Sequence, residues 1–148
     1  DCERPDGAEG QCYRVGIDPT LSDGTGWVGI YWLHPDNNWN GDLGPGCNLE
    51  TATSVTFQVK GTADAIVNFN AAEAIEQPIT LTEEWTEYTI DLSSVWGTEN
   101  VWGGFVFSLA LPVVAEDTDT TVDTDTDTNV AAGGETLVFY IDDITINI

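Results

Sequence analysis

Short segments in which apolar and polar residues alternate recur along most of this chain. The clearest is residues 55–60, where Val55, Phe57 and Val59 alternate with polar side chains. Successive side chains of a β-strand point to opposite faces, so this period of two predicts a strand with one buried face. Similar patterns predict strands at residues 13–17, 26–33, 67–69, 79–81, 88–92, 105–109 and 137–146. No stretch shows a convincing helical period, so the chain is expected to be almost entirely β-structure.

About eight short strands in a chain of 148 residues predict a single domain. The expected fold class is all-β, an antiparallel β-sandwich of the jelly-roll kind. Residues 1–12 are polar and turn-rich, and are expected to form an N-terminal extension to one domain over residues 13–148. The residues expected in the core are Val55, Phe57, Val59, Val67, Phe69, Ile90, Leu92, Phe105, Phe107, Phe139, Ile141 and Ile144.

A low-complexity tract interrupts the pattern at residues 116–128, which read EDTDTTVDTDTDT. It lies between the strand at 105–109 and the last strand, so it is interpreted as an insertion in a loop. An extended Thr-Asp segment places its carboxylates on one face and its hydroxyls on the other. Such a composition is typical of a solvated, mobile linker, and the alternatives for this tract are binding of Ca²⁺, contact with a partner chain, and glycosylation of the threonines.

Acidic residues outnumber basic ones by 26 to 3, which gives a formal net charge of −23. A field of this sign repels phosphate backbones and anionic lipids, so binding to nucleic acid and insertion into a membrane are not expected. No apolar run approaches the roughly 20 residues of a membrane span. The same field attracts cations, of which Ca²⁺ best suits carboxylate ligands. The alternative is that most of the carboxylates only keep the protein soluble.

The three cysteines and the absence of methionine bear on the compartment of the protein. The sequence begins at Asp1, which is interpreted as the start of a processed, secreted protein whose signal peptide has been removed. An oxidising compartment allows a disulfide, and Cys2–Cys12 closes the shortest loop. Cys12–Cys47 and Cys2–Cys47 remain open, and the spare thiol is expected to be buried or bonded to another chain.

Residues 31–39 read YWLHPDNNW, which resembles the YWxxPxNNW element of secreted bacterial jelly-roll domains with the galactose-binding-like fold. Further stretches that resemble elements of these domains are SVTFQVKG at 54–61, EWTEYTIDL at 84–92, GGF at 103–105 and FYIDDI at 139–144. The resemblance spans residues 13–148 and implies a carbohydrate-binding module. The cysteines and the Thr-Asp tract depart from the family pattern.

Aromatic side chains are the first candidates for such a function. The apolar face of a sugar stacks on an exposed indole or phenol ring, and polar neighbours then bond its hydroxyls. The candidates are Tyr31, Trp32, Asn37, Asn38 and Trp39 in or beside the long loop at 34–49, with Trp96 and Trp102 as a second aromatic group. Core packing is the alternative for each tryptophan. The asparagines are alternatively expected to hold the loop through side-chain to backbone hydrogen bonds.

Two carboxylates of the last strand are candidates for a metal site. Asp142 and Asp143 are adjacent, so their side chains are expected to point to opposite faces. A carboxylate that points inward needs a cation or several hydrogen-bond donors. The resemblance implies a structural Ca²⁺ at this position, which Asp18, or Glu3 in the N-terminal extension, would complete. An aspartate that caps backbone amides at a β-bulge is the alternative.

Catalysis has little support in the sequence. His34 is the only histidine, and no HExxH, GxSxG or glycine-rich phosphate loop occurs. The chain is therefore expected to be a non-catalytic, secreted domain that binds a glycan and is stabilised by Ca²⁺. The alternative is a structural subunit that assembles with copies of itself at the cell surface or in an extracellular filament.

Overall fold

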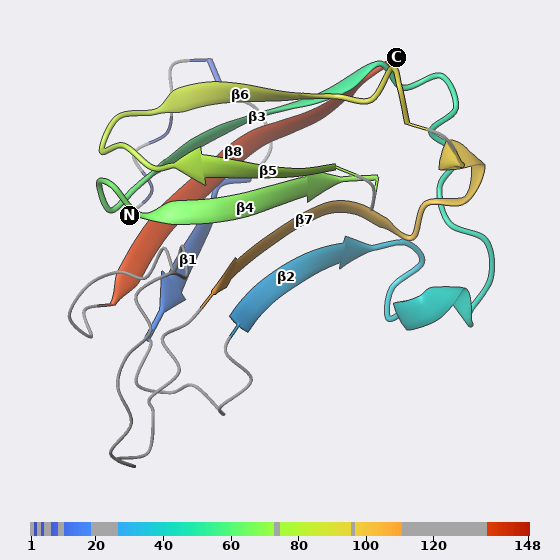
Figure 1. Ribbon diagram of the computed structural model, residues 1–148, viewed down its shortest axis with the longest axis horizontal. Coiled ribbons are helices and arrows are strands. Elements are labelled where there is room, and N and C mark those ends of the chain that lie inside the picture. Colours follow the sequence, from blue (N-terminus) through green and yellow to red (C-terminus); the bar gives the residue numbers. More distant parts are fainter. Residues whose placement is uncertain are drawn as a thin grey trace, which may run out of the picture.

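Two four-stranded antiparallel sheets face each other in the computed structural model of the protein (Figure 1). The structure describes residues 2, 4, 7–8, 11–18, 27–72, 75–95, 97–110 and 136–148. The strands are β1 (Tyr13–Ile17), β2 (Trp27–Leu33), β3 (Ser54–Gly61), β4 (Ile66–Ala71), β5 (Ile75–Thr80), β6 (Thr86–Asp91), β7 (Gly103–Ala110) and β8 (Leu137–Asn147). This arrangement confirms the all-β sandwich that the alternating sequence pattern predicts.

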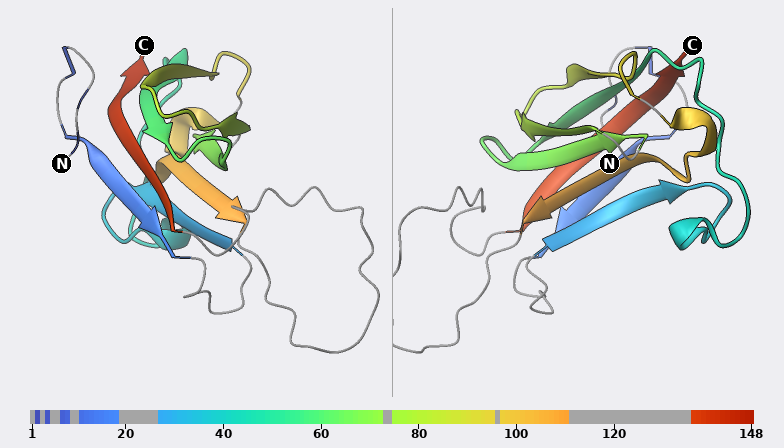
Figure 2. Two further views of the ribbon diagram at one scale, coloured as in Figure 1. Left: turned by 90° about the vertical axis from the view of Figure 1, so that its left-hand side faces the viewer. Right: turned by 45° about the vertical axis from the view of Figure 1, so that its right-hand side comes forward.

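The pairing of the strands follows one rule along the chain. β1 pairs with β8, β2 with β7, β3 with β6 and β4 with β5, so the first half of the chain folds back on the second. Further pairing gives the sheet orders β1-β8-β3-β6 and β2-β7-β4-β5. A long antiparallel hairpin that wraps into two sheets in this way is a jelly roll. The edge strands β1 and β2 lie on the same side of the sandwich (Figure 2).

Phenylalanine side chains fill the space between the two sheets. The buried rings are Phe57, Phe69, Phe105, Phe107 and Phe139. Phe57 of β3 and Phe69 of β4 have ring centroids 4.8 Å apart, and those of Phe107 and Phe139 are 5.0 Å apart, so rings of one sheet contact rings of the other. Every residue predicted for the core is buried except Ile144, which is half-buried and packs against the core from its margin.

A β-bulge in β8 explains the position of Ile144. Between Thr56 and Gln58, β3 is paired with a stretch of β8 that contains one residue more. The extra residue gives Asp143 a left-handed backbone with a φ of 55°, and a bulge of this kind shifts the facing of the side chains that follow it. Asp142 precedes the bulge and is paired with Gln58 of β3, and it is buried, while Asp143 is exposed.

Helical structure is limited to single turns. The helices in the described part of the chain are the 3₁₀ turns η2 (Trp39–Gly41) and η3 (Thr98–Asn100). Among the same residues, no helix is long and apolar enough to cross a membrane. The Thr-Asp tract at 116–128, which is interpreted above as a loop insertion, lies outside the described residues.

Replacing Phe57 with alanine should lower the free energy of unfolding by about 3–5 kcal/mol, because it leaves a cavity at the centre of the ring cluster. Urea unfolding followed by circular dichroism measures this change. Gln58→Ala alters the opposite face of the same strand and should cost less than about 1 kcal/mol. Equal losses in the two variants would contradict a core shared by both sheets.

Candidate functional site

The outward face of the β2-β7-β4-β5 sheet carries side chains that the strand register sets in rows. Two such rows cross β2, β7 and β4. The first consists of Tyr31, Val106 and Asn70, and the second of Gly29, Ser108 and Asn68. Residues directly opposite each other on antiparallel strands share a face of the sheet. The row between them contains Phe107 and Phe69, which are buried in the core, so these two rows point away from the core. We call this side of the sheet the outer face.

Three exposed aromatic side chains stand along one edge of the outer face, on β2 and the loop that follows it. Tyr31 is 38% exposed and Trp39 is 56% exposed, and their ring centroids are 5.0 Å apart with the planes inclined at 54°. Trp27 is 54% exposed. It precedes Tyr31 by four residues on the same strand, which is roughly 13 Å along an extended chain. We call Trp27, Tyr31 and Trp39 the aromatic edge.

The outer face next to the aromatic edge includes one position without a side chain, Gly29, and one polar side chain, Asn70. Gly29 lies between Trp27 and Tyr31, and a Cβ there would come within 2.6 Å of the Phe107 carbonyl oxygen, so this position excludes a side chain. Asn70, in the same row as Tyr31, has a buried Oδ1 with no hydrogen-bond partner in the described part of the chain. A buried oxygen of this kind is commonly satisfied by a bound water molecule.

The loop between β2 and β3 is held around Asn38 and positions Trp39. Asn38 is fully buried. Its Nδ2 donates to the carbonyl oxygens of His34 and Gly44 at 3.2 and 3.1 Å, and its Oδ1 accepts from the Leu43 amide at 2.8 Å. The side chain holds the loop, as the structural alternative for this residue expects, and it does not reach the surface at which a ligand would bind.

The other predicted ligand residues take different places. Asn37 is exposed in the same loop, with a left-handed φ of 63°. Trp102 is half-buried and lies against the loop, where a Cβ added at Gly41 would be 3.3 Å from its Nε1. Trp96 lies outside the described residues. Of the predicted set, the structure therefore brings Tyr31 and Trp39 together on the outer face.

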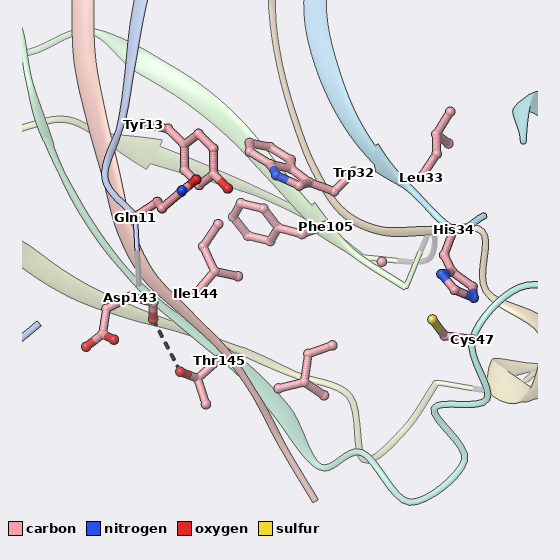
Figure 3. Close-up of a pocket in the computed structure, with 12 residues that line it drawn as sticks. Gln11, Tyr13, Trp32, Leu33, His34, Cys47, Phe105, Asp143, Ile144 and Thr145 are labelled. Carbon is pink, nitrogen blue, oxygen red and sulfur yellow. Dashed lines mark hydrogen bonds between the residues drawn. The ribbon is translucent and has the colours of Figure 1, made fainter. Parts of the chain in front are cut away.

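A pocket of about 730 Å³ opens on the other side of β2, next to β1 (Figure 3). Trp32 lines it, with ring centroids 5.4 Å from Tyr13 and 5.5 Å from Phe105. Ile144 lies opposite these rings. A volume of this size is typical of sites for small molecules. Because neighbouring strand residues point to opposite faces, Trp32 belongs to this pocket while Tyr31 belongs to the outer face.

One end of the pocket is polar. The ring of His34 and the sulfur of Cys47 lie there (Figure 3). The His34 amide donates to the Trp102 carbonyl oxygen at 2.8 Å, and the Cys47 amide donates to the Val101 carbonyl oxygen at 2.8 Å, so the backbone places these two side chains beside each other. Cys47 is the cysteine that the disulfide leaves free, and it is half-buried.

The disulfide joins Cys2 to Cys12, whose Cα atoms are 6.5 Å apart. This confirms the pairing that closes the shortest loop, and it fits a protein of a non-cytoplasmic compartment. Each sulfur atom lies within 4.8 Å of a carboxylate oxygen of Asp142. The N-terminal extension therefore covers Asp142 on β8.

Asp142 is fully buried, and Arg4 of the N-terminal extension binds its carboxylate in a bidentate manner. Arg4 Nε donates to Oδ2 at 2.7 Å, and Arg4 Nη2 donates to Oδ1 at 2.8 Å. The Asp143 backbone amide also donates to Oδ1, at 2.8 Å. The hydrogen bond from Arg4 lowers the pKa of Asp142 below its ordinary value, although burial acts in the opposite direction.

Of the four residues predicted to hold Ca²⁺, the three that the structure describes do not form one cluster. Asp143 is exposed, and its side chain is not part of the group formed by Cys2, Cys12 and Asp142. Asp18 follows the end of β1 that pairs with Leu137, at the start of β8, and so lies far along the strand from Asp142. Glu3 lies outside the described residues. The buried carboxylate is instead surrounded by several donors at a bulge, which is the alternative considered for it.

Two contributions to these sites were not expected from the sequence. Trp27 is not among the predicted ligand residues, although its spacing of four from Tyr31 predicts that both share one strand face. Arg4 had no assigned role. Its signal was indirect: it is one of only 3 basic residues, and it lies between Cys2 and Cys12 in the sequence.

Comparison with known proteins adds no family to this picture. No family model matches the chain, and no curated protein matches it. The resemblance of residues 31–39 to carbohydrate-binding modules therefore stays a prediction.

Acidification should weaken the ion pair between Arg4 and Asp142. The pKa of Asp142 is lowered in the folded protein, so the pair stabilises it fully above the unfolded pKa, roughly 3.9, and this stabilisation is lost as pH falls through the folded value. In Asp142→Asn, the free energy of unfolding should depend less steeply on pH below about pH 4. Urea unfolding across this pH range measures the slope. Asp143→Asn is the control, and the same loss of slope there would contradict the assignment.

Proposed function

We propose that this protein binds carbohydrate on the outer face, at the aromatic edge. The observation that carries the proposal is the exposed pair of Tyr31 and Trp39, with ring centroids 5.0 Å apart, on the face that also carries Asn68 and Asn70 of β4. The apolar face of a sugar stacks on such rings, and amides such as Asn68 and Asn70 exchange hydrogen bonds with its hydroxyls. Tyr31 stands on a strand and the loop around Asn38 holds Trp39, so little conformational entropy is lost on binding.

The position of Trp27 favours an extended ligand. It lies roughly 13 Å from Tyr31 along β2, with only Gly29 between them on that face. One sugar ring cannot contact both aromatic side chains at that separation. An oligosaccharide that runs along β2 would contact both, with the polar rows on one side of it.

The charge of the chain restricts the class of glycan. A net charge of −23 repels polyuronates and sulfated chains, so the ligand is a neutral or a basic glycan. Secretion is part of this proposal, and the Cys2–Cys12 disulfide supports it as far as a non-cytoplasmic compartment.

Affinity electrophoresis tests this function, with soluble β-glucan, xylan, mannan and chitosan as the polysaccharides in the gel. At least one of them should retard the wild-type protein. Trp39→Ala should weaken the binding roughly tenfold or more, because an exposed aromatic side chain at the centre of a contact surface carries much of its binding energy. Leu43→Ala changes another exposed residue of the same loop and should leave the retardation unchanged.

Two outcomes would count against the aromatic edge. If Tyr13→Ala abolishes the retardation while Trp39→Ala retains it, the glycan binds in the pocket beside β1. If none of these polysaccharides retards the protein, carbohydrate binding itself is contradicted.

A second candidate function is self-association, which the position of β2 favours. Among the described strands, β2 lies at the edge of its sheet and pairs with β7, and it exposes Trp27 and Ile30. An edge strand with exposed apolar side chains is a template for pairing with another chain. Repulsion between two copies that each carry a charge of −23 opposes this contact, and salt screens the repulsion.

If the protein self-associates through β2, light scattering after size-exclusion chromatography should show a dimer or larger species that increases with salt. Ile30→Lys should abolish it, because the substitution places a charge on the edge strand. Ile146→Lys alters an exposed isoleucine of β8 and is the matched control. A monomer at every salt concentration would exclude this function.

A further inference from the structure

We propose that Arg4 is the cation at Asp142, in the place where the family resemblance implies calcium, and that the Cys2–Cys12 disulfide holds it there. The buried carboxylate in the middle of β8 is then a cation site that the chain fills with its own side chain. This inference concerns the stability of the domain and does not depend on glycan binding.

The geometry at Asp142 already satisfies the carboxylate. Oδ2 accepts from Arg4 Nε at 2.7 Å, and Oδ1 accepts from Arg4 Nη2 at 2.8 Å and from the Asp143 amide at 2.8 Å. A planar guanidinium matches the two oxygens of a carboxylate and offsets its charge. A metal ion that bound Asp142 directly would have to displace at least one of these donors.

The surroundings of Asp142 suit a guanidinium better than Ca²⁺. Calcium takes 6–8 oxygen ligands in proteins. The cluster of potential ligand groups found among the described residues consists of Cys2, Cys12 and Asp142, which offers one carboxylate and two sulfur atoms. Asp143 is exposed and contributes its backbone amide, and Asp18 lies by the other end of β1. One carboxylate beside a disulfide is a poor set of ligands for a hard cation.

The disulfide places Arg4 over the carboxylate. Arg4 lies between Cys2 and Cys12 in the sequence, and both sulfur atoms lie within 4.8 Å of an Asp142 carboxylate oxygen. Arg4 and Asp142 are 138 residues apart in the sequence. Their contact therefore requires Arg4 to be held in one place, which costs conformational entropy. A covalent link within the N-terminal extension reduces the number of conformations that must be given up when Arg4 binds.

The other two basic residues provide a comparison. Arg14 is exposed on β1, where it is paired with Tyr140 in the register, and Lys60 lies over the rings of Trp85 and Tyr140 at 5.0 and 5.7 Å. Removing Arg14 therefore changes the net charge by the same amount as removing Arg4, without taking a partner from a buried carboxylate.

Thermal unfolding identifies the cation. Excess EDTA and millimolar Ca²⁺ should each leave the wild-type Tm within about 1 °C, because by this proposal no metal supports the folded state. Arg4→Gln should lower the Tm on the order of 10 °C, because it leaves a buried charge without its partner. Arg14→Gln, the matched control, should lower it by no more than about 2 °C.

A double-variant comparison tests the role of the disulfide. If the disulfide acts by holding Arg4, then Arg4→Gln should lower the Tm less in a Cys2→Ser, Cys12→Ser background than in the wild type. Arg4→Lys keeps the charge without the bidentate geometry, and should give a Tm between those of Arg4→Gln and the wild type. It also supplies the comparison if Arg4→Gln does not fold.

Three results would overturn the proposal. A wild-type Tm that falls with EDTA and recovers with Ca²⁺ would show that a metal is the cation. Equal effects of Arg4→Gln and Arg14→Gln would show that only net charge matters. An undiminished effect of Arg4→Gln without the disulfide would show that the disulfide does not hold Arg4.

Discussion

The burial of two apolar sheet faces against each other is the interaction on which the rest of this structure depends. All 5 phenylalanines of the chain lie in that contact, and each is almost fully buried. Because side chains alternate along a strand, turning Phe107 and Phe69 inward turns their neighbours outward. The same constraint on β2 directs Trp32 towards the pocket and Tyr31 towards the solvent.

The outer face and the pocket both follow from this alternation and from the jelly-roll pairing. The outer face sets Tyr31 of β2 in one row with Asn70 of β4, although β2 and β4 pair with β7 and not with each other. Strands give such a face its rigidity, and the buried amide of Asn38 extends that rigidity to Trp39 in the loop. A surface prepared in this way needs little rearrangement when it binds a partner.

The ion pair of Arg4 with Asp142 is the polar counterpart of the aromatic core. A buried carboxylate in a chain with a net charge of −23 requires compensation, and a bidentate guanidinium supplies it. The bulge at Asp143 adds a backbone donor to the same carboxylate. Together these contacts fasten the N-terminal extension to the last strand, so that the two ends of the chain stabilise each other.

The sequence by itself determined the strands, their buried faces and nearly all of the core, because a period of two is a local property that each strand carries alone. Ile144 shows the limit of that reasoning, since a bulge shifts the facing of side chains and depends on the partner strand. Only the tertiary structure decided that Arg4 reaches Asp142, that Asp18 does not, and that Asn38 is buried while Trp39 is exposed. Such contacts join residues far apart in the chain or depend on the path of a loop, and both are settled by which strands pair and not by local spacing.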